Sequence, residues 1–375
     1  MNKKFTDLRA IRMTGDEPDK FMAAIYQRML EQGDAHDTKL PATAAGMAKG
    51  IDNLRMVLRQ DQVDIFRIDA PGTVGAGAIF LSPLVTGKTD TPVFGCQLDD
   101  IVTARGLRGR GIGGFGLAAA ALVARRRGGI ALALECEEGM RNESGILNAD
   151  FYDSNGLSLR AKHIPYRINH ALLTALTEEA RDPSMRITVT PLAQVETLRQ
   201  DFRNAAALFA GRTVDQGAAL HPAWEHAAWQ IRAEMPSRDG TRIFPLATAI
   251  ASRRWSMFRT AKLGQAGFDD GQGKWEQPVG AQIEWMQFEK ESIDKIRVGR
   301  AMIRALTHHM RTEKPGACSF IDWVGLPWKE FDSGLAKSFA AEQNTYSGAP
   351  ERLWKAQDSA FLWLGNRLKP EQLVL

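Results

Sequence analysis

The chain has 375 residues, of which 44% are hydrophobic and 25% are charged, a composition typical of a soluble globular protein. No stretch approaches the roughly 20 uninterrupted apolar residues of a membrane-spanning helix, and no secretory signal is visible after Met1. Three scattered cysteines exclude a disulfide framework and a zinc site, so we expect a cytoplasmic protein without a metal. The net charge of +4 suits anionic ligands, nucleic acid included, and selects none of them.

The composition changes along the chain. All nine tryptophans lie between Trp224 and Trp363, whereas the glycines are densest from 106 to 129. A chain of this length favours two domains. A helical stretch that starts at Ile168 stops before Pro183, and strand-like residues then resume. We therefore predict two domains, at residues 1–183 and 184–375.

The first half predicts a regular order of elements. Strands are expected at 8–13, 63–69, 76–82, 93–103, 130–135 and 157–163, and helices between 18 and 60, at 113–127 and near 147–153. Hairpin-like strand pairs precede a single strand–loop–helix–strand unit. This order predicts an α+β fold with a mixed, mostly antiparallel central sheet flanked by helices.

A glycine-rich loop joins the strand at 93–103 to the apolar helix. Glycines allow close approach of the backbone and positive φ, and the free N–H groups at a helix N-terminus bind phosphate. The pattern therefore predicts a pyrophosphate site at Arg108, Gly109, Arg110, Gly111, Ile112 and Gly113.

Two alternatives to this site stay open. One is a tight turn with surface arginines. The other is a dinucleotide fingerprint, since Gly109, Gly111 and Gly114 fit G-x-G-x-x-G and Glu135 ends the next strand. The arginine-rich approach to the loop and the hairpins before it argue against the fingerprint. A Walker loop is excluded because no Gly-Lys-Ser/Thr follows.

Two motifs resemble the GNAT acetyltransferase superfamily over roughly residues 5 to 165. Its Q/R-x-x-G-x-G/A motif is matched by Arg108, Gly111 and Gly113. Its later Phe-Tyr and Gly-Leu pairs are matched within 151–157. The asparagine of the family's pattern is out of step, because Gly145 holds its position.

The resemblance implies an acyl-CoA site, with acetyl-CoA as the expected co-substrate and an amine as the acceptor. In this family the strand before the loop splays from its neighbour, and its exposed backbone binds the pantetheine arm. Those residues are Ile101, Val102 and Thr103 here, and the Ile101 amide would polarise the thioester. Asn148, one of two asparagines flanking the expected position, is the candidate for a further CoA contact.

Tyr152 is the implied general acid toward the departing thiolate, with a core tyrosine as the structural alternative. The base that deprotonates the amine stays open among several residues. We place Asp99 and Glu135 first; strand alternation puts Asp99 and Asp100 on opposite faces. The further candidates are Asp100, Glu137 and Gln97, the last acting through a water molecule. His163 and His170 could border the cleft, but we expect all seven histidines to be structural or surface residues.

The second half predicts strands at 186–190, 243–251, 256–263, 283–288 and 318–324, and helices up to Phe202 and at 295–310. Gly299 and Ala301 fit the end of the GNAT loop, but Ile296 stands where Arg or Gln is expected. We interpret this half as a degenerate second GNAT-like domain; an unrelated tryptophan-rich domain is the alternative. His308 and His309 are adjacent on a helix and so do not form a metal pair.

The sequence thus predicts an N-acyltransferase in which an amine attacks the acyl-CoA thioester directly. Two alternatives are kept, a Fem-like aminoacyltransferase and a non-catalytic GNAT-fold module that binds protein or nucleic acid. The acceptor could be a protein, a small molecule or a nucleobase, and the sequence does not rank them. No membrane partner is expected, and homodimerisation is left open.

Overall fold

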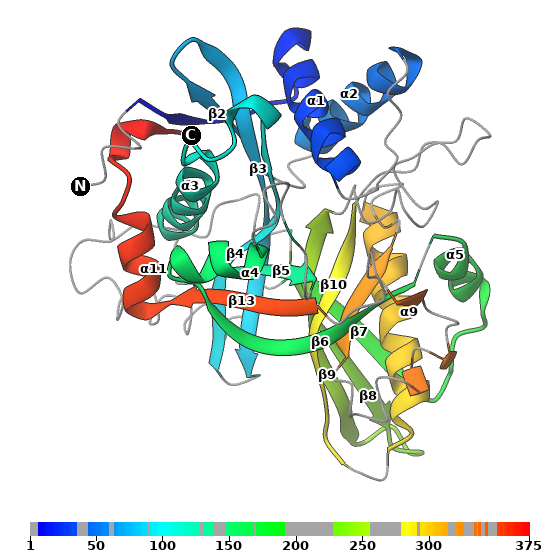
Figure 1. The fold of residues 1–375 in the computed structure, drawn as a ribbon. Coiled ribbons are helices and arrows are strands. Elements are labelled where there is room, and N and C mark those ends of the chain that lie inside the picture. Colours follow the sequence, from blue (N-terminus) through cyan, green and yellow to red (C-terminus); the bar gives the residue numbers. More distant parts are fainter. Residues whose placement is uncertain are drawn as a thin grey trace.

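The structure, a computed structural model, describes the residues given at the end of this sentence: 7–35, 44–59, 64–88, 91–127, 129, 131–137, 141, 147–168, 170–191, 228–255, 279–290, 293–313, 318, 320–325, 334–335, 337–338, 342–343 and 351–375. Within them, strands from the two halves of the chain form two sheets that meet at one shared strand (Figure 1).

The first sheet follows the expected antiparallel order from β1 to β4. Its members are β1 (Arg9–Arg12), β2 (Asp64–Ala70), β3 (Thr73–Lys88), β4 (Thr91–Thr103) and β5 (Ala131–Glu137). β4 and β5 are parallel, because the chain crosses between them through the helix α3 (Ile112–Arg126). The helices α1 (Asp19–Ala35) and α2 (Ala44–Arg59) precede β2.

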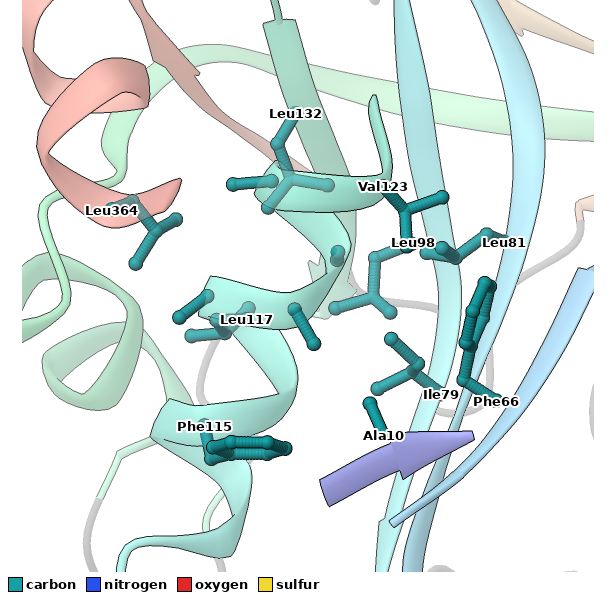
Figure 2. Close-up of a cluster of buried hydrophobic side chains, with 14 of the residues drawn as sticks. Ala10, Phe66, Ile79, Leu81, Leu98, Phe115, Leu117, Val123, Leu132 and Leu364 are labelled. Atoms are coloured by element: carbon teal, nitrogen blue, oxygen red, sulfur yellow. The ribbon is translucent and has the colours of Figure 1, made fainter. Parts of the chain in front are cut away.

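Helices cover both faces of this sheet. Ile79 and Leu81 of β3 pack against α3, whereas Ala78 and Phe80 pack with α1 and α2, as strand alternation requires. Figure 2 shows Val123 of α3 pointing toward Leu98 and Leu81 of the sheet. The alanine run 118–121 of α3 is fully buried, so the helix lies close against the strands.

The second half repeats this arrangement. Its strands are β7 (Arg186–Pro191), β8 (Ala228–Pro236), β9 (Ile243–Trp255), β10 (Val279–Phe288) and β11 (Ile321–Gly325). β7 to β10 are antiparallel, and β10 and β11 are parallel with α9 (Lys295–Glu313) between them. Its core gathers around Trp229, Met302 and Leu306.

The two halves exchange segments. β6 (Ser158–Ile168), preceded by α4 (Asn148–Ser154), crosses to pair with β11 and leads into α5 (His170–Glu178), which packs on α9. In return, β13 (Glu351–Gln357) lies between β5 and β6, and α11 (Asp358–Gly365) packs on α3 (Figure 1). A short strand β12 (Glu342–Gln343) also pairs with β6.

The C-terminal segment then completes the first half. After the turn η4 (Pro370–Gln372), β14 (Leu373–Val374) pairs in parallel with the outer edge of β1. Phe361, Leu364 and Leu373 belong to the first core, whereas Ile168, Leu173 and Leu176 belong to the second. The division at residues 183 and 184 remains a proposal, since the cores trade segments across it.

The expected fold class is confirmed as a duplicated, mostly antiparallel mixed sheet flanked by helices. Four strands, β8, β12, β13 and β14, were not predicted from the sequence patterns. The predicted strand at 256–263 and the predicted helix up to Phe202 lie outside the described residues.

Candidate active site

A β-bulge in β4 opens the sheet. Phe80 of β3 pairs with Asp100 and Leu81 pairs with Leu98, so Asp99 is the extra residue. β4 pairs with β5 from Gly95 as far as Leu98, which lies opposite Leu134. Beyond that point the two strands have no further pairs in the part of the chain that the structure describes. The splay expected of the strand before the loop is therefore present, and it begins at the bulge.

Ile101, Val102 and Thr103 follow the bulge. On one edge they pair with Ile79, Ala78 and Gly77 of β3. The opposite edge faces the splay, where alternate peptide N–H and C=O groups point away from β3. This arrangement leaves an extended backbone edge that can bind an extended ligand.

The glycine-rich loop lies directly after this edge. It begins with the turn η2 (Arg105–Leu107) and passes through Arg108, Gly109 and Arg110, of which Arg110 is exposed. Gly111 has a φ of 87° and is the N-cap of α3, with no side-chain hydrogen bond to the helix end. The first N–H groups of α3, from Ile112 onward, are therefore not capped by a side chain. They and the positive end of the helix dipole point toward the loop.

The loop is tied to α1 at its start. The backbone N–H of Arg105 donates to Glu31 at 3.0 Å, and Arg28 donates to the same carboxylate at 2.6 Å. These bonds lower the pKa of Glu31, against the opposing effect of burial. The position of the loop therefore depends on a helix from the other face of the sheet.

Tyr152 lies at the same end of the sheet. It is 9% exposed, and its ring meets Phe151 edge to face at 5.3 Å between centroids. A Cβ on Gly113 would lie 3.1 Å from the Phe151 ring, so α4 packs directly on the first turn of α3. The tyrosine and the helix N-terminus are thus fixed against each other.

Burial raises the pKa of Tyr152 far above its usual range, and negative charge on Cys136 and Asp100 adds to the effect. The hydroxyl therefore stays protonated at neutral pH, as a proton donor must. Asp100 is close enough to act on Tyr152 electrostatically, so the structure brings the bulge and the tyrosine together.

Strict alternation was wrong for the two aspartates. The hydroxyl of Ser82 donates to Asp99, and Phe80 lies opposite Asp100. Ser82 and Phe80 are on the same face of β3, since they are two residues apart. The bulge therefore turns both carboxylates toward one face.

The remaining predicted residues lie around the splay. Glu135 is half-buried and is the first residue of β5 beyond its last pair with β4. Asn148 is the half-buried first residue of α4, one turn before Tyr152. Gln97 is buried next to Ser82. The side chains of Glu137, His163 and His170 lie outside the described part.

Two residues that the sequence did not single out hold α4 in place. Asn155 donates to the carbonyl of Phe151 at 2.8 Å, and Arg367 donates to the Asn155 side chain at 2.8 Å. Arg367 comes from the C-terminal segment that crosses back from the second half. No local signal pairs residues 212 positions apart in sequence.

The second half contains the same bulge with different chemistry. Glu284 of β10 is the extra residue, and Ser252 donates to it as Ser82 does to Asp99. Arg254 also donates to Glu284, at 2.6 Å, and to Gln282, at 2.9 Å. By strand register the residue in the place of Arg254 is Leu84 in the first half. A buried ion pair thus fills the second bulge.

The helix that follows also differs. The carboxylate of Asp294 accepts the Arg297 N–H at 3.0 Å, so a side chain already caps α9. Gly299 and Ala301 lie inside α9, which starts at Lys295, and not in a loop before it. The segment around Gly299 and Ala301, which resembles the end of the phosphate loop, therefore does not lead into an uncapped helix N-terminus.

No protein-family model matches the chain, and no curated protein matches it. Among the helices described, none is both long and apolar enough to cross a membrane. The chain is similar to several solved structures. One is a tandem GNAT protein from the clavulanic acid biosynthesis pathway, at 13% identity and a TM-score of 0.45, covering 94% of this chain and 98% of that one.

Another is a GCN5-related N-acetyltransferase from Kribbella flavida, at 12% identity and a TM-score of 0.36, covering 94% of this chain and 71% of that one. A third is the N-myristoyltransferase of Saccharomyces cerevisiae, at 8% identity and a TM-score of 0.40, covering 94% and 83%. These likenesses are distant, and the fold stands on its own strand order and register.

Proposed function

We propose that this protein is an acyl-CoA-dependent N-acyltransferase whose acyl-CoA site lies in the first half. The observation that carries the proposal is the splay of β4 from β5 at the Asp99 bulge, with the glycine-capped N-terminus of α3 at the end of the same strand. A backbone edge and a phosphate site are thus placed in line, as an extended ligand with a pyrophosphate end requires. The acetyl group is our expectation for the acyl moiety.

The residues present fit such a ligand. The N–H groups at the start of α3 would hold the pyrophosphate, since no side chain caps them, and Arg108 and Arg110 add positive charge. The edge Ile101–Thr103 would pair with the pantetheine arm, and an amide there would polarise the thioester carbonyl. The bound acyl-CoA supplies an activated thioester that an amine can attack directly.

Tyr152 is our candidate for protonating the departing thiolate, because its raised pKa keeps the hydroxyl protonated. Asp99 and Glu135 remain our candidates for accepting the proton of the amine. Asp99 accepts a hydrogen bond from Ser82 and lies at the opening of the splay, whereas Glu135 lies across it on β5. If the acyl-CoA binds on one side of the splay, the other side remains open to the acceptor amine.

The second half is proposed to bind no acyl-CoA of its own. Glu284 is neutralised by Arg254, and α9 is capped by Asp294. Its role would then be structural, since β6 and β13 tie its sheet to the first one. A protein that uses aminoacyl-tRNA would not need the uncapped helix; copurification of RNA would favour that alternative.

The binding step is tested by isothermal titration calorimetry with acetyl-CoA. We expect binding in the micromolar range, and Arg110→Glu to weaken it at least tenfold, or about 1.4 kcal/mol. The matched control is Arg238→Glu, which changes another exposed arginine, on the turn between β8 and β9, and should bind acetyl-CoA as the wild type does. Absence of wild-type binding at tens of micromolar would remove the proposal.

The chemical step is tested by thiol release from acetyl-CoA with a panel of amines. Tyr152→Phe should lower kcat roughly 100-fold while acetyl-CoA affinity stays the same. Tyr26→Phe is the control, because Tyr26 is also a buried tyrosine but lies in the core between α1 and α2. If no amine releases thiol although acetyl-CoA binds, the non-catalytic alternative gains support.

A further inference from the structure

A cavity of about 480 Å³ lies in the second half, between the strand β7 and the helix α9 (Figure 1). Met185, Ile187 and Val189 form one wall, and Ala301 and Ala305 of α9 form the opposite wall. Ile187 and Val189 are on the same face of β7 because they are two residues apart, and the two alanines are about one helical turn apart. The small side chains of α9 thus leave an apolar slot between the helix and the strand.

Two arginines and a histidine flank this slot. The guanidinium of Arg304 donates to the carbonyl of Ala180 at 2.6 Å, which holds it next to the start of Arg181. Both arginines line the cavity. His308 follows Arg304 by four residues on α9, so the two side chains are neighbours on the helix surface, and His308 lines the cavity too. N–H donors therefore gather beside an apolar space.

The carboxylates near these cations already have basic partners. The pairs are Asp182 with Arg297, Glu179 with Arg300, and Glu234 opposite Arg186 across β8 and β7. Asp182 is the single carboxylate that lines the cavity. Within the described residues, Arg181 and Arg304 are paired with no carboxylate. An anionic group placed between them would therefore meet positive charge that no described side chain neutralises.

We propose that the β7–α9 cavity binds an amphipathic carboxylate, that is, a small molecule with a linear aliphatic chain and one carboxylate group. The chain lies in the slot between Ile187 and Ala305, and the carboxylate accepts hydrogen bonds from Arg304 and Arg181. The cavity volume is within the roughly 300–1,000 Å³ of small-molecule sites, which combine an apolar lining with a few polar groups. The site is in the other half from the splay and does not depend on the proposed enzyme activity.

The test is isothermal titration calorimetry of the full chain with sodium octanoate, and we expect saturable binding at one site. Octylammonium has the same chain and the opposite charge, so it should bind at least about tenfold more weakly. Acetate has the carboxylate without the chain. It should bind at least about 100-fold more weakly, because each buried methylene strengthens binding roughly fourfold.

Arg304→Gln separates the charge from the shape of the site. It should weaken octanoate binding about tenfold and leave the binding of octanamide, the neutral analogue, unchanged. Arg238→Gln, on the turn between β8 and β9, is the control and should bind both compounds as the wild type does. Ala305→Trp, which fills the slot, should abolish binding of both. Arg304 is partly exposed, so Arg304→Gln remains informative where the tryptophan variant fails to fold.

Equal affinity for octanoate and octylammonium would overturn the proposal, as would equal affinity for octanoate and acetate. An Arg304→Gln variant with wild-type affinity for octanoate would also overturn it. So would displacement of octanoate by saturating acetyl-CoA, because that would place the probe at the splay. Octanoate binding without acetyl-CoA binding would contradict the proposed function alone, so the two failures are distinguishable.

Discussion

The buried ion pair in the second bulge offers a quantitative prediction. The side chains of Arg254 and Glu284 are 5% and 6% exposed, and they lie 2.6 Å apart. Arg254→Leu would leave the Glu284 carboxylate buried without the positive charge that now neutralises it. Breaking such a pair typically costs about 3–5 kcal/mol, so we expect the free energy of unfolding to fall by that amount.

The double variant Arg254→Leu, Glu284→Leu should recover most of this loss. Replacing both charges removes the uncompensated carboxylate, and buried pairs exchanged for apolar residues are often neutral in stability. In the first half, Leu84 of β3 occupies the position that corresponds to Arg254 of β9, on the strand that pairs across the bulge in β4. The structure therefore predicts a strong positive coupling between the two substitutions.

Urea unfolding followed by tryptophan fluorescence is the suitable assay, because Trp229 and Trp323 lie in the core of the second half. Arg232→Leu, on the exposed side of β8, is the control and should change the unfolding free energy by less than about 0.5 kcal/mol. A loss below about 1 kcal/mol for Arg254→Leu, or a double variant as unstable as the single one, would refute the reasoning.

Three further changes test the first half. Burial raises the pKa of Tyr26 to about 12, so the stability it contributes is complete below pH 10 and is lost as the pH rises from about 10 to 12. The wild type should therefore lose up to about 2.7 kcal/mol of unfolding free energy through Tyr26 at alkaline pH, and Tyr26→Phe should not show this loss. Urea unfolding at pH 9 and pH 11.5 measures the difference. Gly113→Val should lower kcat about tenfold, because its side chain would press on Phe151, while Gly106→Ala, with open space around it, should not. Glu31→Gln should raise the KM for acetyl-CoA several-fold by weakening a charged hydrogen bond to the turn before the loop; an unchanged KM would show that the loop holds its position without α1.

Local patterns in the sequence predicted the backbone features around the candidate site. Glycine spacing and an apolar helix predicted a loop and a helix N-terminus, and the structure has Gly111 at positive φ as the cap of α3. The Phe-Tyr pair predicted a helix near 147–153, observed as α4. These features depend on backbone conformation and on periodicity over a few residues, which the sequence specifies directly.

The position of the two aspartates depended on the bulge, which the sequence did not reveal. A single extra residue in β4 changes which face each later side chain takes, and it arises only when β4 pairs with β3. The same holds for Glu284, whose partner Arg254 lies on the neighbouring strand. Alternation within one strand contains no information about register with another.

The sequence alone thus determined the two halves of different composition, the strand order from β1 to β5, and the glycine-rich loop before the apolar helix α3. Only the tertiary structure decided that β6 pairs with β11 of the second half, that β13 lies between β5 and β6, and that Arg367 holds the helix that carries Tyr152. The physical reason is that strand partners are chosen by hydrogen bonds and packing between segments far apart in the chain. Such contacts are set by the free energy of the whole fold, and no short stretch of residues encodes them.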